Sequence, residues 1–110
     1  MLRFLTMPTR TWADAHFADA RVKATLAASD AFIAPAKLES FGIAALEART
    51  MGLPVLAYAA TGISSFVHHE VEGLLAADDR AMTDAIARIA TDDALRERIA
   101  EHNRTTEPEQ

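Results

Sequence analysis

The chain has 110 residues, a net charge of −5, 50% hydrophobic residues and no cysteine. This length accommodates one domain rather than two, and the composition is that of a globular protein rather than a disordered one. The absence of cysteine excludes disulfides, cysteine-based zinc sites, iron–sulfur clusters and a thiol nucleophile. The acidic balance argues against nucleic acid or an anionic membrane as the main partner, because both require a basic face.

The first half of the chain is predicted to alternate short strands with helices. In chain order we expect a strand over Leu2–Thr6, a helix over Thr11–Ala28, a strand over Ala31–Ala34 and a helix over Ser40–Thr50. The last of these helices is the clearest, because Ser40 is a favourable N-cap. Gly52 and Pro54 then end that helix.

The second half continues the same alternation. We expect a strand over Pro54–Tyr58, a loop over Ala59–Ser65, one or two helical turns within Ser64–His69, a strand over Gly73–Ala76, and helices over Asp79–Ala90 and Asp92–His102. Thr91 is predicted to cap the last helix. Residues 1–103 are predicted to form one domain, and residues 104–110, which contain no apolar side chain, a mobile tail.

This alternation predicts an α/β fold with a Rossmann-like parallel sheet of about four strands, flanked by helices. In such sheets, ligands bind beyond the carboxyl ends of the strands. Two predicted loops occupy that position, Pro35–Ser40 and Ala59–Ser64. Any binding or catalytic chemistry is therefore expected in these loops first.

Two glutamates flank the start of the clearest helix. Glu39 and Glu47 are eight residues apart, which on a helix separates them by about 12 Å along the axis and about 80° around it. They are too far apart to share a proton or a metal ion, but they suit the two ends of an elongated ligand. Gly42 lets a ligand approach the helix N-terminus, which attracts phosphate, and carboxylates accept hydrogen bonds from sugar hydroxyls. From spacing alone, however, a solvated helix with an acidic start is the more frequent explanation.

A family resemblance favours the ligand-binding interpretation. Residues 29–53, which include Glu39-Ser40-Phe41-Gly42-Ile43-Ala44-Ala45-Leu46-Glu47, resemble the donor-binding segment of retaining GT-B glycosyltransferases of the group 1, or family 4, type. Pro54-Val55-Leu56-Ala57 continues the resemblance, and Val71-Glu72-Gly73-Leu74-Leu75 is similar to the next signature of that family. The similarity covers roughly residues 1–103 and implies an incomplete GT-B C-terminal domain.

The resemblance also implies roles for individual residues. Glu39 matches the glutamate that binds hydroxyls of the transferred sugar and is the implied catalytic residue. Glu47 matches the glutamate that holds the nucleotide ribose, and Gly62 falls where the family often has a double glycine near the donor. The full donor-binding set implied is Glu39, Ser40, Phe41, Gly42, Ile43, Glu47 and Gly62. The implied reaction transfers a hexose from a UDP- or GDP-linked sugar with retained configuration, without a metal or another cofactor.

The chain departs from the family in what it lacks. The basic pair that holds the diphosphate, the first strand and helix of the domain, and the N-terminal domain with the acceptor pocket all have no counterpart here. Losing two charge-assisted contacts of about 1.5–3 kcal/mol each weakens donor binding by about 10²–10⁴-fold. We therefore expect the chain to be inactive alone and to need the missing domain or a partner chain, with an acceptor that the sequence leaves unknown. An unpaired sheet edge predicts self-association.

Two alternatives to the glycosyltransferase interpretation remain open. One is a non-catalytic nucleotide-sugar-binding or interaction module, and the other is a fragment of a GT-B nucleotide-sugar epimerase. A metal site at His68-His69 is not expected, because adjacent residues do not face one another on a helix. The chain has no apolar run of about 18 residues and no secretory signal pattern at its start, so we expect it in the cytoplasm. Glu70 stands where the family often has glycine, which predicts a strained turn.

Overall fold

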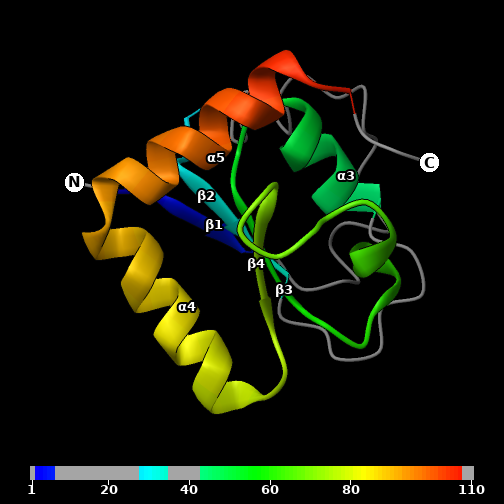
Figure 1. The fold of residues 1–110 in the computed structure, drawn as a ribbon, viewed down its shortest axis with the longest axis vertical. Helices are drawn as coiled ribbons and strands as arrows, with labels where there is room; N and C mark the ends of the chain where they lie inside the picture. The colour runs from blue at the N-terminus through cyan, green and yellow to red at the C-terminus, as the bar shows by residue number, and fades with distance from the viewer. Residues whose placement is uncertain (1, 7–27, 35–42, 108–110) are drawn as a thin grey trace.

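A computed structural model of the chain describes residues 2–6, 28–34 and 43–107. Four strands form one sheet in the order β1-β2-β3-β4, and each neighbouring pair is parallel. The strands are β1 (Phe4–Thr6), β2 (Ala31–Ile33), β3 (Val55–Tyr58) and β4 (Gly73–Ala76). The helices are α3 (Ile43–Thr50), the 3₁₀ helix η1 (Gly62–Ser65), α4 (Asp79–Thr91) and α5 (Asp93–Thr105). The predicted α/β fold with a parallel sheet of four strands is confirmed (Figure 1).

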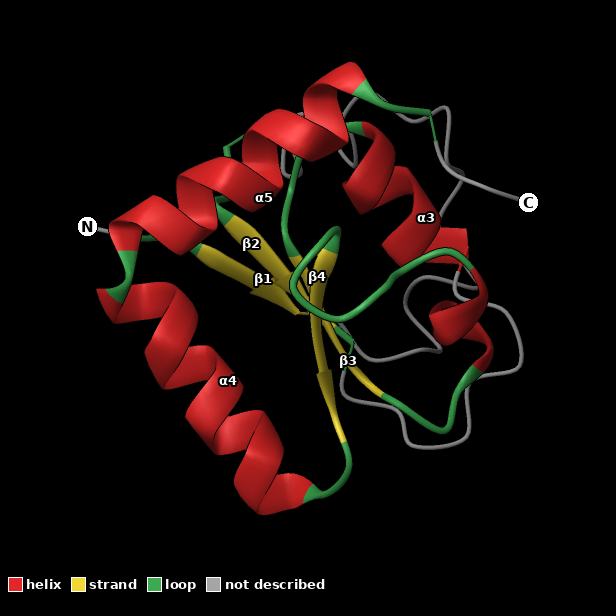
Figure 2. Ribbon diagram, viewed as in Figure 1, coloured by secondary structure: helices red, strands yellow, loops and turns green. Residues whose placement is uncertain are grey.

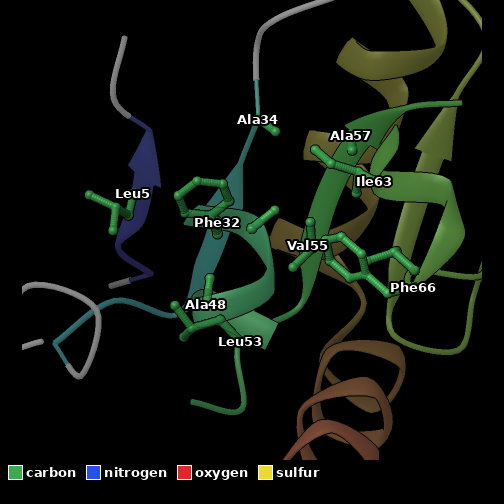
Figure 3. Close-up of a cluster of buried hydrophobic side chains, with 11 residues drawn as sticks. Leu5, Phe32, Ala34, Ala48, Leu53, Val55, Ala57, Ile63 and Phe66 are labelled. Atoms are coloured by element: carbon green, nitrogen blue, oxygen red, sulfur yellow. The ribbon is translucent and has the colours of Figure 1, made fainter. Parts of the chain in front are cut away.

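Apolar side chains cover both faces of the sheet, as parallel sheets require. On one face, strand residues such as Phe32 and Val55 pack with Ala48 of α3 and with Ile63 of η1 (Figure 3). On the other face, strand residues such as Leu56 pack against α4 and α5. Figure 2 shows α4 and α5 on one side of the sheet and α3 on the other. The successive residues of β3 therefore alternate between two cores.

Carboxylate caps start the two C-terminal helices. Asp78 accepts a hydrogen bond from the Ala81 main-chain N–H at 2.8 Å, and Asp92 accepts one from Leu95 at 3.0 Å. Behind these caps, each helix buries a stripe of side chains at helical spacing. The buried residues are Met82, Ala85 and Ile89 in α4, and Leu95, Ile99, Ala100 and Asn103 in α5.

In the first half of the chain, the predicted elements match the observed ones wherever the structure describes the residues. β1 begins at Phe4 rather than Leu2, and β2 and β3 fall within their predicted ranges. The predicted helix Thr11–Ala28 lies outside the described residues except for Ala28, which is in a turn. α3 is described from Ile43 onward, so the predicted cap at Ser40 also lies outside them.

Two predictions in the second half are wrong. Thr91 does not cap the last helix, because it is the final residue of α4 and donates its hydroxyl to the Ala87 carbonyl at 2.8 Å. Asp92 takes the capping position instead. The helical turns expected within Ser64–His69 are replaced by η1, which starts earlier and ends at Ser65. Serine hydroxyls that bond back to main-chain carbonyls favour this tight, short turn.

The last helix extends further than its sequence predicts. α5 runs to Thr105, three residues past the predicted end at His102, so Arg104 and Thr105 are helical although they fall at the start of the predicted tail. The polar residue Asn103 is only 2% exposed. Its buried amide makes hydrogen bonds with main-chain carbonyls, a partner that apolar patterning cannot detect.

Candidate functional site at the carboxyl edge of the sheet

The carboxyl ends of the four parallel strands lie at the same end of the sheet, which we call its carboxyl edge. α3 follows β2, η1 follows β3 and α4 follows β4 along the chain. β3 ends at Tyr58 and leads into η1, while β4 ends at Ala76 and leads into α4. This is the edge where parallel sheets bind ligands. Of the two loops singled out from the sequence, Ala59–Ser64 follows β3 at this edge, and Pro35–Ser40 lies outside the described residues.

α3 carries the described part of the glutamate motif. Ile43 is the first described residue of α3, and Glu47 lies one turn later with a half-buried side chain. Ala45 and Ala48 are buried and hold α3 against the sheet, and their small size allows a close approach. The predicted site residues Glu39, Ser40, Phe41 and Gly42 lie outside the described residues. Their predicted roles stay predictions.

A network of hydroxyl hydrogen bonds shapes the loop that carries Gly62. Thr61 donates its hydroxyl to the Tyr58 carbonyl at 2.8 Å, and Ser64 donates to the Thr61 carbonyl at 2.9 Å. Ser65 donates to the carbonyl of Gly62 itself at 2.8 Å. These bonds fix a tight turn directly after β3, with Gly62 as the first residue of η1.

The helix of Glu47 and the turn of Gly62 pack on the same apolar cluster. Ile63, next to Gly62, is 1% exposed and belongs to the same apolar cluster as Ala45 and Ala48 of α3 (Figure 3). The elements that carry Glu47 and Gly62 therefore rest on one supporting core. The roles that the resemblance implies for Glu47 and Gly62 stay predictions.

Sequence reasoning missed one polar pair at this edge. The Tyr58 hydroxyl, at the end of β3, donates to Asp79 Oδ1 at the start of α4 at a distance of 2.7 Å. This pair ties the carboxyl end of β3 to α4. The available signal was a tyrosine closing an apolar strand, together with an acidic residue opening the helix that follows the next strand.

A buried carboxylate lies at the opposite edge, which is formed by the amino ends of the strands. Glu72, which is 7% exposed, accepts hydrogen bonds from the His68 main-chain N–H at 2.7 Å and contacts His68 Nδ1 at 2.9 Å. Its second oxygen lies 3.1 Å from His102 Nε2. Burial raises the pKa of Glu72, but the hydrogen bonds from His68 and His102 together outweigh it, so the pKa lies below its ordinary value.

A shallow pocket of about 200 Å³ also lies at this opposite edge, before the starts of β2 and β3. It is lined by Ser29, Asp30, Met51, Gly52, Leu53, Arg96, Glu97, Ala100 and Arg104. Its position separates it from α3's described start and from η1. Among the described residues, polar side chains therefore gather at each end of the strands.

Within the described ranges, no three or more histidine, aspartate or glutamate side chains are grouped as a metal site would need. His68 and His69 each have a separate partner within the protein. His68 binds Glu72, and His69 Nδ1 accepts the main-chain N–H of Leu75 at 3.0 Å. A separate finding is that none of the described helices has the length and apolarity to cross a membrane.

Comparison with known proteins identifies relatives among enzymes that transfer sugars. The chain is 45% identical over 75 residues to D-inositol 3-phosphate glycosyltransferase of Actinosynnema mirum, which covers 66% of this chain and 18% of that protein. It is 33% identical over 72 residues to alpha-D-kanosaminyltransferase of Streptomyces kanamyceticus, which covers 64% of this chain and 19% of that protein. The chain thus spans less than a fifth of these curated relatives.

A solved structure is similar in fold. It is the C-terminal domain of a glycosyl transferase group 1 family protein from Francisella tularensis, with a TM-score of 0.63, 24% identity, and coverage of 81% of this chain and 47% of that one. The family model described as "Glycosyl transferases group 1" matches residues 15–106, which is most of the chain. The chain therefore belongs to the group 1 glycosyl transferases.

Proposed function

We propose that the chain binds the nucleotide-sugar donor of a retaining hexosyltransferase, with the donor lying at the carboxyl edge of the sheet between α3 and η1. The observation that carries the proposal is Glu47, which is half-buried on α3 and belongs to an element that shares its core with the Gly62 turn. Family membership supports the sugar-transfer chemistry. The proposal includes a UDP- or GDP-linked donor and cytoplasmic residence, where such donors are used.

The proposed roles follow the order of groups in the donor. Glu47 accepts hydrogen bonds from the ribose hydroxyls, since a carboxylate is a strong acceptor for them. Glu39 accepts hydrogen bonds from the transferred sugar and lies closest to the reacting centre. The main-chain N–H groups of Ser40, Phe41, Gly42 and Ile43 face the diphosphate, and Gly62 lines the opposite side of the donor. We propose no resident metal: amides at the helix N-terminus offset part of the phosphate charge, and basic side chains from outside this chain offset the rest.

The complete reaction needs more than this chain supplies. The chain spans less than a fifth of the relatives that transfer sugars, so the acceptor pocket and the second wall of the cleft belong to residues beyond the matched part. We expect weak donor binding and no sugar transfer from the 110 residues alone. Robust transfer by the purified chain, measured as nucleoside diphosphate release with sugar acceptors, contradicts this expectation.

The test of the proposed function is a titration followed by nuclear magnetic resonance. The ¹⁵N-labelled chain is titrated with UDP-glucose and, separately, with GDP-mannose at millimolar concentrations. Glu47→Gln removes the charge but keeps the shape, so we expect affinity to fall by about 10- to 100-fold, the loss of hydrogen bonds to a charged group. Glu101→Gln is the matched control, because Glu101 is an exposed carboxylate on α5. Absent binding, or equal affinity in Glu47→Gln and wild type, contradicts the proposal.

A further inference from the structure

We propose that Arg49 is a positioning residue of the donor site: by binding the end of α5 it holds α3, and with it Glu47, in the orientation that the donor needs. This inference rests on the proposed function. Arg49 follows Glu47 by two residues, which places the two side chains about 200° apart around the helix. One side of α3 thus carries the proposed donor contact, and the other carries the anchor.

The anchor is a buried guanidinium that reaches across the chain. Arg49 is 1% exposed, the largest of the fully buried side chains among the described residues. Its Nη1 donates to the Asn103 carbonyl at 2.9 Å and to the Thr106 carbonyl at 2.5 Å. Both carbonyls lie at the C-terminus of α5, where main-chain carbonyls lack partners within the helix and a cation is favoured. A charge-assisted contact therefore ties α3 to the end of α5, and Figure 1 shows the two helices next to each other there.

The end of α5 is itself fixed to the sheet. The side-chain amide of Asn103 donates to the carbonyls of Leu53 and Glu72, each at 2.9 Å. These carbonyls lie just before β3 and β4. The carboxylate of Glu72 adds an attraction to the charge of Arg49. Arg49 therefore connects α3, through α5, to the two strands that lead into the carboxyl edge.

Besides Arg49, the described side chains of α3 that contact the core of the sheet are Ala45, Leu46 and Ala48. Ala45 and Ala48 are buried and permit close approach but interlock poorly, and Leu46 packs against the same core while only partly buried. If the orientation of α3 changes, the Glu47 side chain turns away from the ribose through the same angle. A misplacement of about 1 Å is enough to cost up to about 100-fold in an interaction that depends on orientation. Loss of the Arg49 anchor is therefore expected to weaken donor binding without touching the donor.

The experiment compares two variants of Arg49. Arg49→Met removes the guanidinium and its hydrogen bonds, and Arg49→Lys keeps a cation able to reach one carbonyl. The probes are UDP-glucose and GDP-mannose, titrated into each folded full-length variant. We expect affinity to fall about tenfold in Arg49→Met and about threefold in Arg49→Lys. Residual dipolar couplings of amides 43–50 are expected to report a changed orientation of α3, by tilt or by rotation, relative to β3 and β4.

Ile89→Val is the control for lost stability, because Ile89 is fully buried on α4, against the other face of the sheet. Its affinity is expected to equal that of wild type. The inference is overturned by wild-type affinity in both Arg49 variants, by equal weakening in Ile89→Val, or by an unchanged orientation of α3. If Arg49→Met does not fold, the comparison of Arg49→Lys with Ile89→Val decides. A wild-type chain that does not bind, or a Glu47→Gln variant with unchanged affinity, signals instead that the proposed function has failed.

Discussion

The carboxylate of Glu72 lies 3.1 Å from Nε2 of His102, a residue 30 positions later in the chain. Glu72 precedes β4, and His102 lies in the last turns of α5. The contact therefore joins the start of β4 to α5. Because Glu72 is buried, this contact makes the packing of α5 dependent on the charge of one carboxylate.

That dependence predicts loss of stability in acid. The pKa of Glu72 is lower in the folded chain than in the unfolded chain, where a glutamate titrates at about 4.3. The folded state then binds fewer protons, so the stability from Glu72 is fully present above pH ~5 and is lost as pH falls through its folded pKa. Glu72→Gln is expected to lower the free energy of unfolding at pH 7 by about 1–2 kcal/mol and to flatten its decline in acid. Urea unfolding at pH 7, 5 and 4 measures both effects.

Glu101→Gln serves as the control for this acid prediction. Glu101 is exposed and pairs with Arg104 on the surface of α5, and such pairs contribute little to stability. Its variant should follow the wild-type decline between pH 7 and pH 4. An equal decline in Glu72→Gln and wild type would show that Glu72 does not carry the acid sensitivity.

Gly73 is predicted to be irreplaceable at the start of β4. A Cβ added at Gly73 would overlap the main-chain carbonyl of Val55 on the neighbouring strand, and that carbonyl belongs to rigid backbone. We expect Gly73→Ala to lower the free energy of unfolding by more than about 3 kcal/mol or to abolish folding. Circular dichroism during thermal unfolding measures the loss.

Gly52→Ala provides a graded comparison for Gly73. Gly52 has a φ of +89°, which an alanine adopts only with strain, but its added Cβ would meet the flexible side chain of Arg104. The expected loss is about 1–2 kcal/mol, smaller than at Gly73, because that side chain is able to move. A larger loss at Gly52 than at Gly73 would contradict the steric explanation.

Glu70 occupies a turn that favours glycine. Its φ is +67°, and Arg88, 2.8 Å away, lowers the pKa of its carboxyl through a hydrogen bond on the surface. Since exposed ion pairs contribute little, relief of backbone strain should outweigh loss of this pair. We expect Glu70→Gly to raise the melting temperature and Glu70→Ala, which keeps the strain and loses the pair, to lower it. Differential scanning calorimetry of both variants decides, and an equal effect of both would show that the backbone is unstrained.

The sequence predicts the parallel sheet because its strands are apolar runs of the right length. Val55–Tyr58 directly follows Pro54, and Gly73–Ala76 begins with a glycine and is followed, after Ala77, by the helix cap Asp78. These local signals agree with the final packing. The helix Asp79–Thr91 was predictable for the same reason, since its buried residues recur at helical spacing. The turn at Glu70, expected to be strained because the family often has glycine there, has the positive φ that favours glycine.

Contacts between distant polar groups could not be predicted from the sequence. Asn103 is polar, so composition places it at a solvated helix end, yet the carbonyls of Leu53 and Glu72 make it a core residue. His102 likewise has no partner within reach along the chain and finds Glu72 only in the folded state. At the candidate site, the sequence places Glu47 on a helix and Gly62 in a turn after a strand, as the structure shows. The residues between Pro35 and Gly42 lie outside the described part, so Glu39 remains a prediction.

The location of donor binding tests the account most directly. In a titration of the ¹⁵N-labelled chain with UDP-glucose or GDP-mannose, the largest amide shifts are predicted at the start of α3 and in η1, including Ile43, Glu47 and Gly62. The amides around the pocket at the opposite edge, such as Gly52 and Arg104, are predicted to stay unchanged. Shifts confined to that opposite edge, or none at α3 for either nucleotide sugar, would contradict the account.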